Sequence, residues 1–147
     1  MPDGPAVGET AAPATVLQGG RAKAYRPMSE PDRAAAYAAG LAAYDRGDFF
    51  LAHELLEPAW MGTADLGERE LYQGLIKLAA GYVHGVRGNP AGIAKNLEGA
   101  RERLSAARDE GFDGGLDLDD LIASIDERLA QLASPASSTA IPLEHPS

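Results

Sequence analysis

The stretch Asp48-Phe49-Phe50-Leu51-Ala52-His53-Glu54-Leu55-Leu56-Glu57-Pro58-Ala59-Trp60-Met61 decides how this chain folds. At 100° per residue its small and aliphatic side chains share one arc of a helical wheel, which is typical of a core-facing helix. The other arc carries Phe50, His53, Glu54, Glu57, Trp60 and Met61. A face meant only for water rarely carries several large apolar side chains. The pattern therefore predicts a helix that is covered at least partly on both faces, with its polar groups beside apolar walls.

His53 and Glu57 lie four residues apart, so their side chains can touch on one face of this helix. Two interpretations stay open. In the first, the two residues form a buried hydrogen-bonded pair that fixes helix packing, because buried polar groups need partners. In the second, they are metal ligands or an acid–base pair. The spacing His-x-x-x-Glu arises often by chance, which favours the structural interpretation.

Composition limits the classes of protein to which the chain can belong. The 147 residues predict one domain, and the lack of cysteine excludes disulfides and thiolate metal sites. The net charge of -9 argues against nucleic acid and anionic lipid as partners. No apolar run approaches the roughly 18 residues that span a bilayer. Residues 1–20 also lack the pattern of a signal peptide, so we expect a cytoplasmic protein.

Apolar periodicity and capping residues predict about five helices. We expect them at 29–47, 48 to about 57, 67–86, 90–108 and 117–132. The second should kink or end near Glu57, because Pro58 has no amide proton to donate. Residues 29–133 then form a single helical domain. Residues 1–28 are expected to be a flexible N-terminal tail with a short ordered piece near 17–25, and residues 134–147 a flexible C-terminal tail.

An internal repeat aligns Arg46-Gly47-Asp48 with Arg87-Gly88-Asn89 at two helix junctions. It predicts an all-α fold with two antiparallel, tetratricopeptide-like helical hairpins followed by a C-terminal helix. The same alignment places Ala94 opposite His53 and Arg101 opposite Trp60. Hairpin geometry therefore does not itself demand His53 and Trp60, which favours a specific role for both.

A second polar stripe lies on the expected third helix. It contains Gln73, Lys77 and His84, opposite the leucine-rich side of that helix. Glycines at 74, 81 and 85 are costly in an exposed helix, so they suggest close approach of a neighbour, and the second helix is our candidate. The sequence thus predicts one polar cluster between the second and third helices. Its members are His53, Glu54, Glu57, Gln73, Lys77 and His84, beside Trp60.

The acidic turn from Asp109 to Asp120 partly matches a twelve-residue calcium loop. Its third position is Gly111, and its last is an aspartate instead of the longer glutamate that binds Ca²⁺ through both oxygens. We therefore interpret it as a solvated turn in which Asp117 caps the fifth helix.

The run Gly47 to Glu57, followed by Trp60, resembles the domain-of-unknown-function family 309, as does the run Gln73 to Ala80 followed by His84 and Gly88-Asn89. The resemblance covers about residues 30–130 and implies a compact, all-helical prokaryotic domain without an assigned activity. It also implies that six residues are the family-type polar and aromatic positions: His53, Glu54, Glu57, Trp60, Gln73 and His84. This chain departs from the family pattern at Pro58 and at Lys77, where glutamine is common.

Our leading hypothesis is a ligand-binding or interaction module with a structural His/Glu cluster. The alternative is a metal-dependent hydrolase in which His53, Glu57 and His84 bind a divalent ion and Glu54 is the general base. Apart from this metal ion, the cofactors are left unknown by the sequence. A homodimer is left open, and a small molecule or protein partner is not identified by the sequence.

Overall fold

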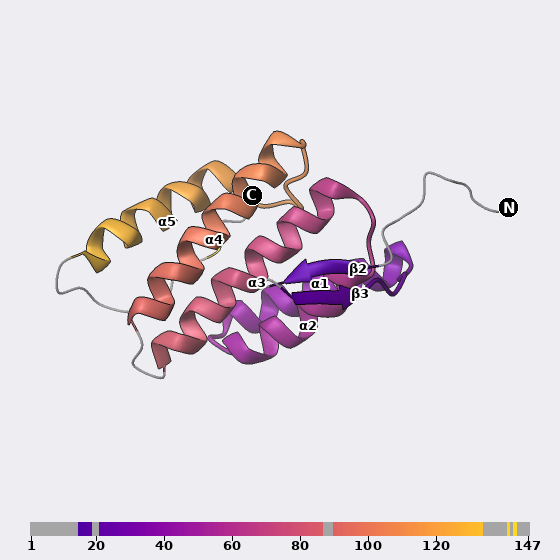
Figure 1. Cartoon of the computed structure of the whole chain (residues 1–147), viewed down its shortest axis with the longest axis horizontal. Helices are drawn as coiled ribbons and strands as arrows, with labels where there is room; N and C mark the ends of the chain where they lie inside the picture. The colour runs from indigo at the N-terminus through magenta and orange to yellow at the C-terminus, as the bar shows by residue number, and fades with distance from the viewer. Residues whose placement is uncertain (1–14, 19–20, 87–89, 134–140, 142, 144–147) are drawn as a thin grey trace, which may run out of the picture.

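The computed structural model describes residues 15–18, 21–86, 90–133, 141 and 143, with the backbone alone described for the two short strands and for residues 84–86. Five helices make up most of this part of the chain (Figure 1). They are α1 (Glu30–Asp45), α2 (Phe49–Met61), α3 (Leu66–Val86), α4 (Pro90–Asp109) and α5 (Leu118–Leu132). The predicted all-α fold is confirmed.

The helices pack as two hairpins and a final helix. α1 packs on α2, α3 packs on α4, α2 joins the hairpins by packing on α3, and α5 lies on α4 (Figure 1). This arrangement fits the tetratricopeptide-like hairpins predicted from the repeat. A glycine permits the close approach inside each hairpin. A Cβ at Gly40 would lie 2.7 Å from Leu56 Cγ, and one at Gly74 would lie 2.7 Å from Leu104 Cδ2.

Capping residues set three helix starts as expected. The side chain of Ser29 accepts a hydrogen bond from the Asp32 amide at 3.2 Å, and Asp117 accepts one from the Asp120 amide at 3.1 Å. Asp48 caps α2 through the Leu51 amide at 3.3 Å. These caps satisfy amides that lack partners within the helix, so the sequence places the starts accurately.

The course of the chain at Pro58 differs from one of our expectations. An end of the second helix near Glu57 is wrong, since α2 continues to Met61 with Pro58 inside it. Pro58 cannot donate to the carbonyl four residues earlier, and this loss destabilises the helix. The last turn nevertheless buries Ala59 completely and leaves Trp60 only 1% exposed. Burial of that indole offsets the missing hydrogen bond, and Trp60 belongs to the core.

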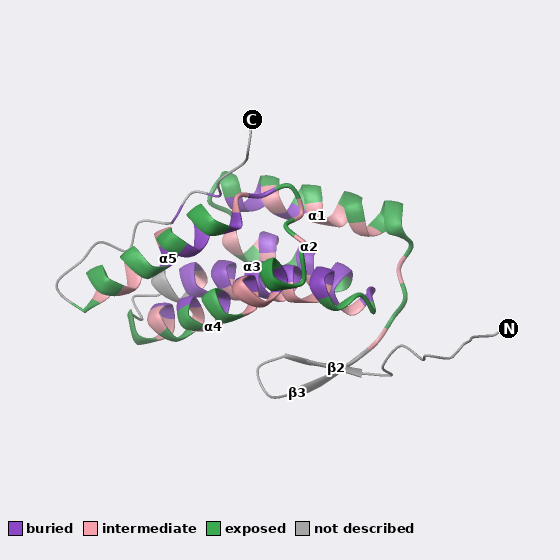
Figure 2. Ribbon diagram, turned by 90° about the horizontal axis from the view of Figure 1, so that it is seen from above, coloured by how far each residue is buried: buried purple, intermediate pink, exposed green. Residues whose placement is uncertain are grey.

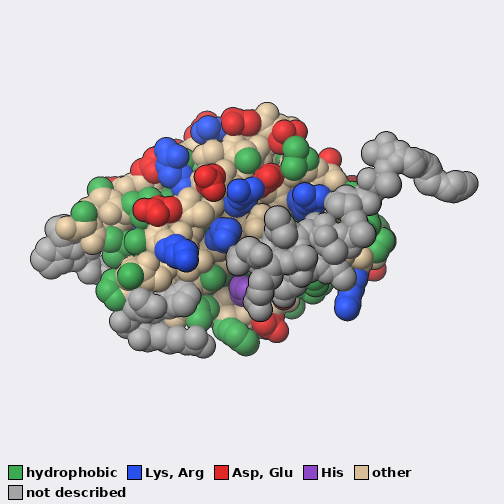
Figure 3. All heavy atoms as spheres, in the orientation of Figure 1, with side chains coloured by type: hydrophobic (Ala, Val, Ile, Leu, Met, Phe, Trp, Pro, Cys, Tyr) green, Lys and Arg blue, Asp and Glu red, His purple; other side chains and the backbone are tan. Residues whose placement is uncertain are grey.

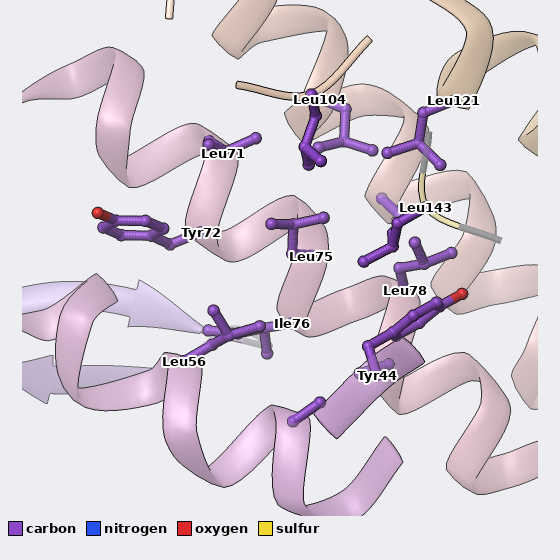
Figure 4. Close-up of a cluster of buried hydrophobic side chains, with 14 of the residues drawn as sticks. Tyr44, Leu56, Leu71, Tyr72, Leu75, Ile76, Leu78, Leu104, Leu121 and Leu143 are labelled. Carbon is purple, nitrogen blue, oxygen red and sulfur yellow. The ribbon is translucent and has the colours of Figure 1, made fainter. Parts of the chain in front are cut away.

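The core runs along the inner faces of the helices, and the exposed residues form the outer faces (Figure 2). Leucine and tyrosine side chains from α1, α2, α3, α4 and α5 meet in its centre (Figure 4). No helix in the described part of the chain is both long and apolar enough to cross a membrane.

Both terminal segments contain ordered pieces, and the N-terminal one lies where the sequence predicts a short ordered piece near residues 17–25. Strands β2 (Thr15–Gln18) and β3 (Arg21–Ala24) pair antiparallel. In the following segment, the Arg26 amide donates to the carbonyl of Met61, the last residue of α2, and the Met28 amide donates to that of Gly62, both at 3.0 Å. Near the other end, Ile141 and Leu143 are buried in the core. The expected flexibility of residues 1–28 and 134–147 stays a prediction, and it falls largely on residues outside the described part, namely 1–14, 19–20, 134–140, 142 and 144–147.

Candidate functional site

His53 lies on the outer side of α2, where its side chain is 27% exposed. Its Nδ1 atom is nevertheless buried, and no described residue gives it a hydrogen bond. The nearest acidic atom is Oε2 of Glu54 at 3.9 Å, which is too long for a hydrogen bond. Glu54 is itself 53% exposed. The imidazole therefore has one ring nitrogen that is withdrawn from water without a partner in the described part of the chain.

The same face of α2 exposes a large aromatic side chain. Phe50 is 60% exposed and stands one helical turn before His53, so the two side chains are neighbours on the surface. Glu57 follows one turn later and is half-buried. We call Phe50, His53, Glu54 and Glu57 the α2 outer face. It combines an exposed apolar ring, an imidazole and two carboxylates on one rigid element.

Lys77, one of the predicted residues of the third helix, lies against α4. Lys77 packs its aliphatic stem on α4, where a Cβ at Gly99 would lie 2.8 Å from its Cδ. Gly74 and Gly81 also face α4, so the close neighbour of these glycines is α4 and not the expected α2. Gln73 is half-buried on α3. The side chain of His84 lies outside the described residues, so the full predicted cluster stays a prediction.

A metal centre receives no direct support from the described part of the chain. Within it, no group of three or more histidine, aspartate or glutamate side chains could hold an ion. The predicted ligand set of His53, Glu57 and His84 includes a side chain outside that part and stays a hypothesis.

The most elaborate polar site is one that the sequence analysis missed, and it surrounds Glu68 in the first turn of α3. This carboxylate accepts hydrogen bonds from Arg33 Nε at 2.8 Å, from the Tyr72 hydroxyl at 2.6 Å and from Thr63 Oγ1 at 2.8 Å. Arg33 also donates to the carbonyl of Met28. The Glu68 side chain is 10% exposed and that of Arg33 18%. These four side chains, the Glu68 network, join α1, the α2–α3 turn and α3.

The Glu68 network has a definite protonation state. Burial alone would raise the pKa of Glu68, but the hydrogen bonds from Arg33, Tyr72 and Thr63 outweigh it, and the pKa is lowered. Burial and the neighbouring carboxylate raise the pKa of Tyr72 above its usual range. Glu68 is therefore ionised and Tyr72 protonated at neutral pH, as a carboxylate that accepts and a phenol that donates require. This is the chemistry of a structural anchor, because every group already has a partner.

Acidification should weaken the Glu68 network and so lower the stability of the domain. Because the pKa of folded Glu68 is depressed, its contribution to stability is complete above its unfolded value and is lost as the pH falls through the folded value. We expect the free energy of unfolding, measured by urea denaturation, to drop as the pH falls below the ordinary pKa of a glutamate carboxyl. A Glu68→Gln variant should start less stable and lose less over this range. Equal slopes for the two proteins would contradict the assignment.

The acidic turn between α4 and α5 borders a hollow of about 340 Å³ lined in part by Arg108, Phe112 and Asp119. Its carboxylates have local partners. Asp113 accepts from the Gly115 amide at 2.8 Å, and Asp119 pairs with Arg108 at 3.1 Å. Acidic and basic side chains are also interspersed on the face of the molecule shown in Figure 3. These contacts agree with a solvated turn.

Comparison with known proteins finds one family match, which covers part of the chain. The family described as "Domain of unknown function (DUF309)" matches residues 37–96, from the middle of α1 to the first turns of α4. The match includes the α2 outer face and Glu68, but neither Arg33 nor α5. No curated protein matches the chain. The resemblance drawn from the sequence is thus confirmed by a match to this family over residues 37–96.

Proposed function

We propose that this chain is a non-catalytic interaction module that binds a protein partner through the α2 outer face. The observation that carries the proposal is His53 Nδ1, which is buried without a hydrogen-bond partner among the described residues. A buried polar atom of this kind costs free energy unless a partner supplies the missing bond. A bound protein can supply it from a backbone amide or carbonyl, because a neutral imidazole nitrogen can either accept or donate.

The neighbours of His53 suit such a partner. Phe50 offers an exposed aromatic ring, the residue type that is enriched at the centre of protein interfaces. The exposed carboxylate of Glu54 places a negative charge on the α2 outer face and can pair with a basic side chain of the partner. A helix supported by the core on its other side holds these groups in a fixed register, which lowers the entropic cost of binding.

Site-specific photocrosslinking in the host cell tests the proposal. A photoreactive phenylalanine analogue at position 50 should give a discrete crosslinked species, and adding His53→Ala should reduce its yield severalfold. The matched control is the same analogue at Leu66, which is also an exposed large apolar residue, at 47%, but begins α3. Crosslinking at position 50 no stronger than at position 66, or unchanged by His53→Ala, would contradict a partner on the α2 outer face.

The alternative function, a metal-dependent hydrolase, depends on the same atom, Nδ1 of His53. A histidine that binds a metal must present an unprotonated ring nitrogen, and Glu57 lies one turn away on the same helix. His84 would complete the ligand set, and Glu54 would act as general base. Stoichiometric divalent metal in the untagged protein, lost in His53→Ala, would favour this function over the interaction module.

Our proposals for the cellular location and for the remaining classes of partner rest on the composition of the chain alone. We propose a cytoplasmic protein that does not bind nucleic acid, because its net charge of -9 repels phosphate. A homodimer through the exposed aromatic ring of Phe50 is the simplest form that a protein partner can take, and light scattering distinguishes it from a different partner.

A further inference from the structure

Residues 25–29 lead from β3 to α1 and lie against the end of α2, and we call them the N-terminal strap. Its Arg26 and Met28 amides donate to carbonyls at the end of α2, which have no partners within that helix. Met28 also packs closely on Gly62, because a Cβ added to this glycine would overlap the Met28 Cβ atom. The strap therefore caps α2 from a distant part of the sequence.

The N-terminal strap is held mainly by polar bonds and not by the core. Tyr25 and Met28 are half-buried, its other three residues are exposed, and none of the five belongs to the buried cluster of the helices. The helices beside it are held by fully buried side chains, such as Trp60 and Leu71. A segment with few buried apolar contacts opens at a lower free-energy cost than the whole fold. The strap can thus open on its own.

One side chain of α1 fastens the N-terminal strap to α3. Arg33 donates to the carbonyl of Met28, and its Nε atom donates to the carboxylate of Glu68 at 2.8 Å. Tyr72 and Thr63 hold that carboxylate in place. The ion pair fixes the direction of the guanidinium, so the strap carbonyl has a charged donor that is already oriented. The Arg33 side chain keeps 18% of its surface exposed, so once released it can turn toward water.

We propose that the N-terminal strap is a detachable unit that opens while the helical domain stays folded, with the contact between Arg33 and Glu68 as its latch. In the closed state the strap caps the end of α2. In the open state the carbonyls of Met61 and Gly62 lose their donors, in the turn that follows Pro58 and already lacks one hydrogen bond. Opening therefore loosens the C-terminal end of α2. The device rests on contacts within the chain, so it can fail or hold independently of the α2 outer face.

Hydrogen exchange of single amides, followed by NMR on the full chain at neutral pH, tests the proposal. In the wild type the Arg26 and Met28 amides should exchange faster than those of Leu75 and Leu104, whose side chains are buried in the core. Arg33→Met removes the latch and keeps a long side chain. It should accelerate the two strap amides roughly tenfold more than the two core amides, as expected when a hydrogen bond to a charged group is lost.

Tyr72→Phe is the matched control. It removes one hydrogen bond from Glu68 but leaves both contacts of Arg33 in place, so strap and core amides should accelerate by the same factor. A second test variant, Glu68→Gln, weakens the latch with almost no change of shape and serves if Arg33→Met does not fold. It should accelerate the strap amides roughly threefold more than the core amides, because a neutral acceptor bonds the guanidinium less strongly.

Three results would overturn the proposal. The first is a wild-type chain in which the strap amides exchange as slowly as the core amides, because the strap would then open only when the whole domain unfolds. The second is an equal acceleration of strap and core amides in the folded latch variant. The third is a Tyr72→Phe chain whose strap amides accelerate as much as those of Arg33→Met, because the latch would then not be the contact of Arg33 with the strap.

Discussion

Replacing Glu68 with alanine is expected to destabilise the domain by about 3 kcal/mol, near the lower end of the range for breaking a buried ion pair. The substitution leaves the donors of Arg33, Tyr72 and Thr63 without their common acceptor. Tyr72 and Thr63 are each 3% exposed, so water cannot easily replace the carboxylate. Arg33 keeps 18% of its side chain exposed and can turn toward solvent, which limits the loss. The melting temperature should fall by roughly 10 °C.

The control for this experiment is Glu102→Ala. Glu102 pairs with Arg103 at 3.5 Å, but its side chain is 75% exposed, so its removal should change stability by less than about 0.5 kcal/mol. Urea denaturation followed by circular dichroism measures both variants. A Glu68→Ala protein as stable as Glu102→Ala would show that the Glu68 network contributes no net stability.

Trp60→Ala is expected to have a still larger effect, about 3–5 kcal/mol, because it removes the largest fully buried side chain and leaves a cavity. The indole sits in the last turn of α2, after Pro58, where the helix already lacks one hydrogen bond. Without the indole, that turn keeps the hydrogen bonds from the Arg26 and Met28 amides but loses its largest packing contact. We expect hydrogen exchange of the amides at the C-terminal end of α2 to accelerate more than exchange elsewhere.

Phe50→Ala provides the matched control on the same helix. It also removes a large aromatic ring, but Phe50 is 60% exposed, so stability should change by less than about 0.5 kcal/mol. Thermal melts of both variants by circular dichroism make the comparison. Similar losses for the two would contradict the assignment of Trp60 to the core. Trp60 is the only tryptophan, so its fluorescence reports unfolding in the wild type and in Phe50→Ala.

The sequence predicts the helices well because the signals that define them are local. Ser29, Asp48 and Asp117 cap the expected helices, and apolar residues at helical spacing form their buried faces. One of the two expectations at Pro58, an end of the helix near Glu57, was wrong. The rule that proline ends a helix considers only the local backbone. The helix continues past Pro58 because Trp60 is buried against other elements.

The candidate site was harder to predict because it depends on which helices meet. The sequence places Lys77 on a polar stripe, but only the packing of α3 on α4 shows that its stem lies on Gly99. The Glu68 network joins Arg33 to a residue far away in the sequence, and no motif links them. The spacing from Asp65 to Glu68 is typical of a capping box, and Asp65 does accept from the Glu68 amide at 2.8 Å. The Glu68 carboxylate, however, turns toward Arg33 and not back to the Asp65 amide, which Thr63 satisfies instead at 3.1 Å.

The segment that leads into α1 gives the molecule a mechanical property. Its Arg26 and Met28 amides donate hydrogen bonds to the carbonyls at the end of α2. Arg33 in turn donates hydrogen bonds to the Met28 carbonyl and to the carboxylate of Glu68. Tension applied to the N-terminal end of the chain therefore reaches the final turn of α2 and the start of α3 together. A single molecule pulled from that end should resist until these bonds break at once, and then yield in one step.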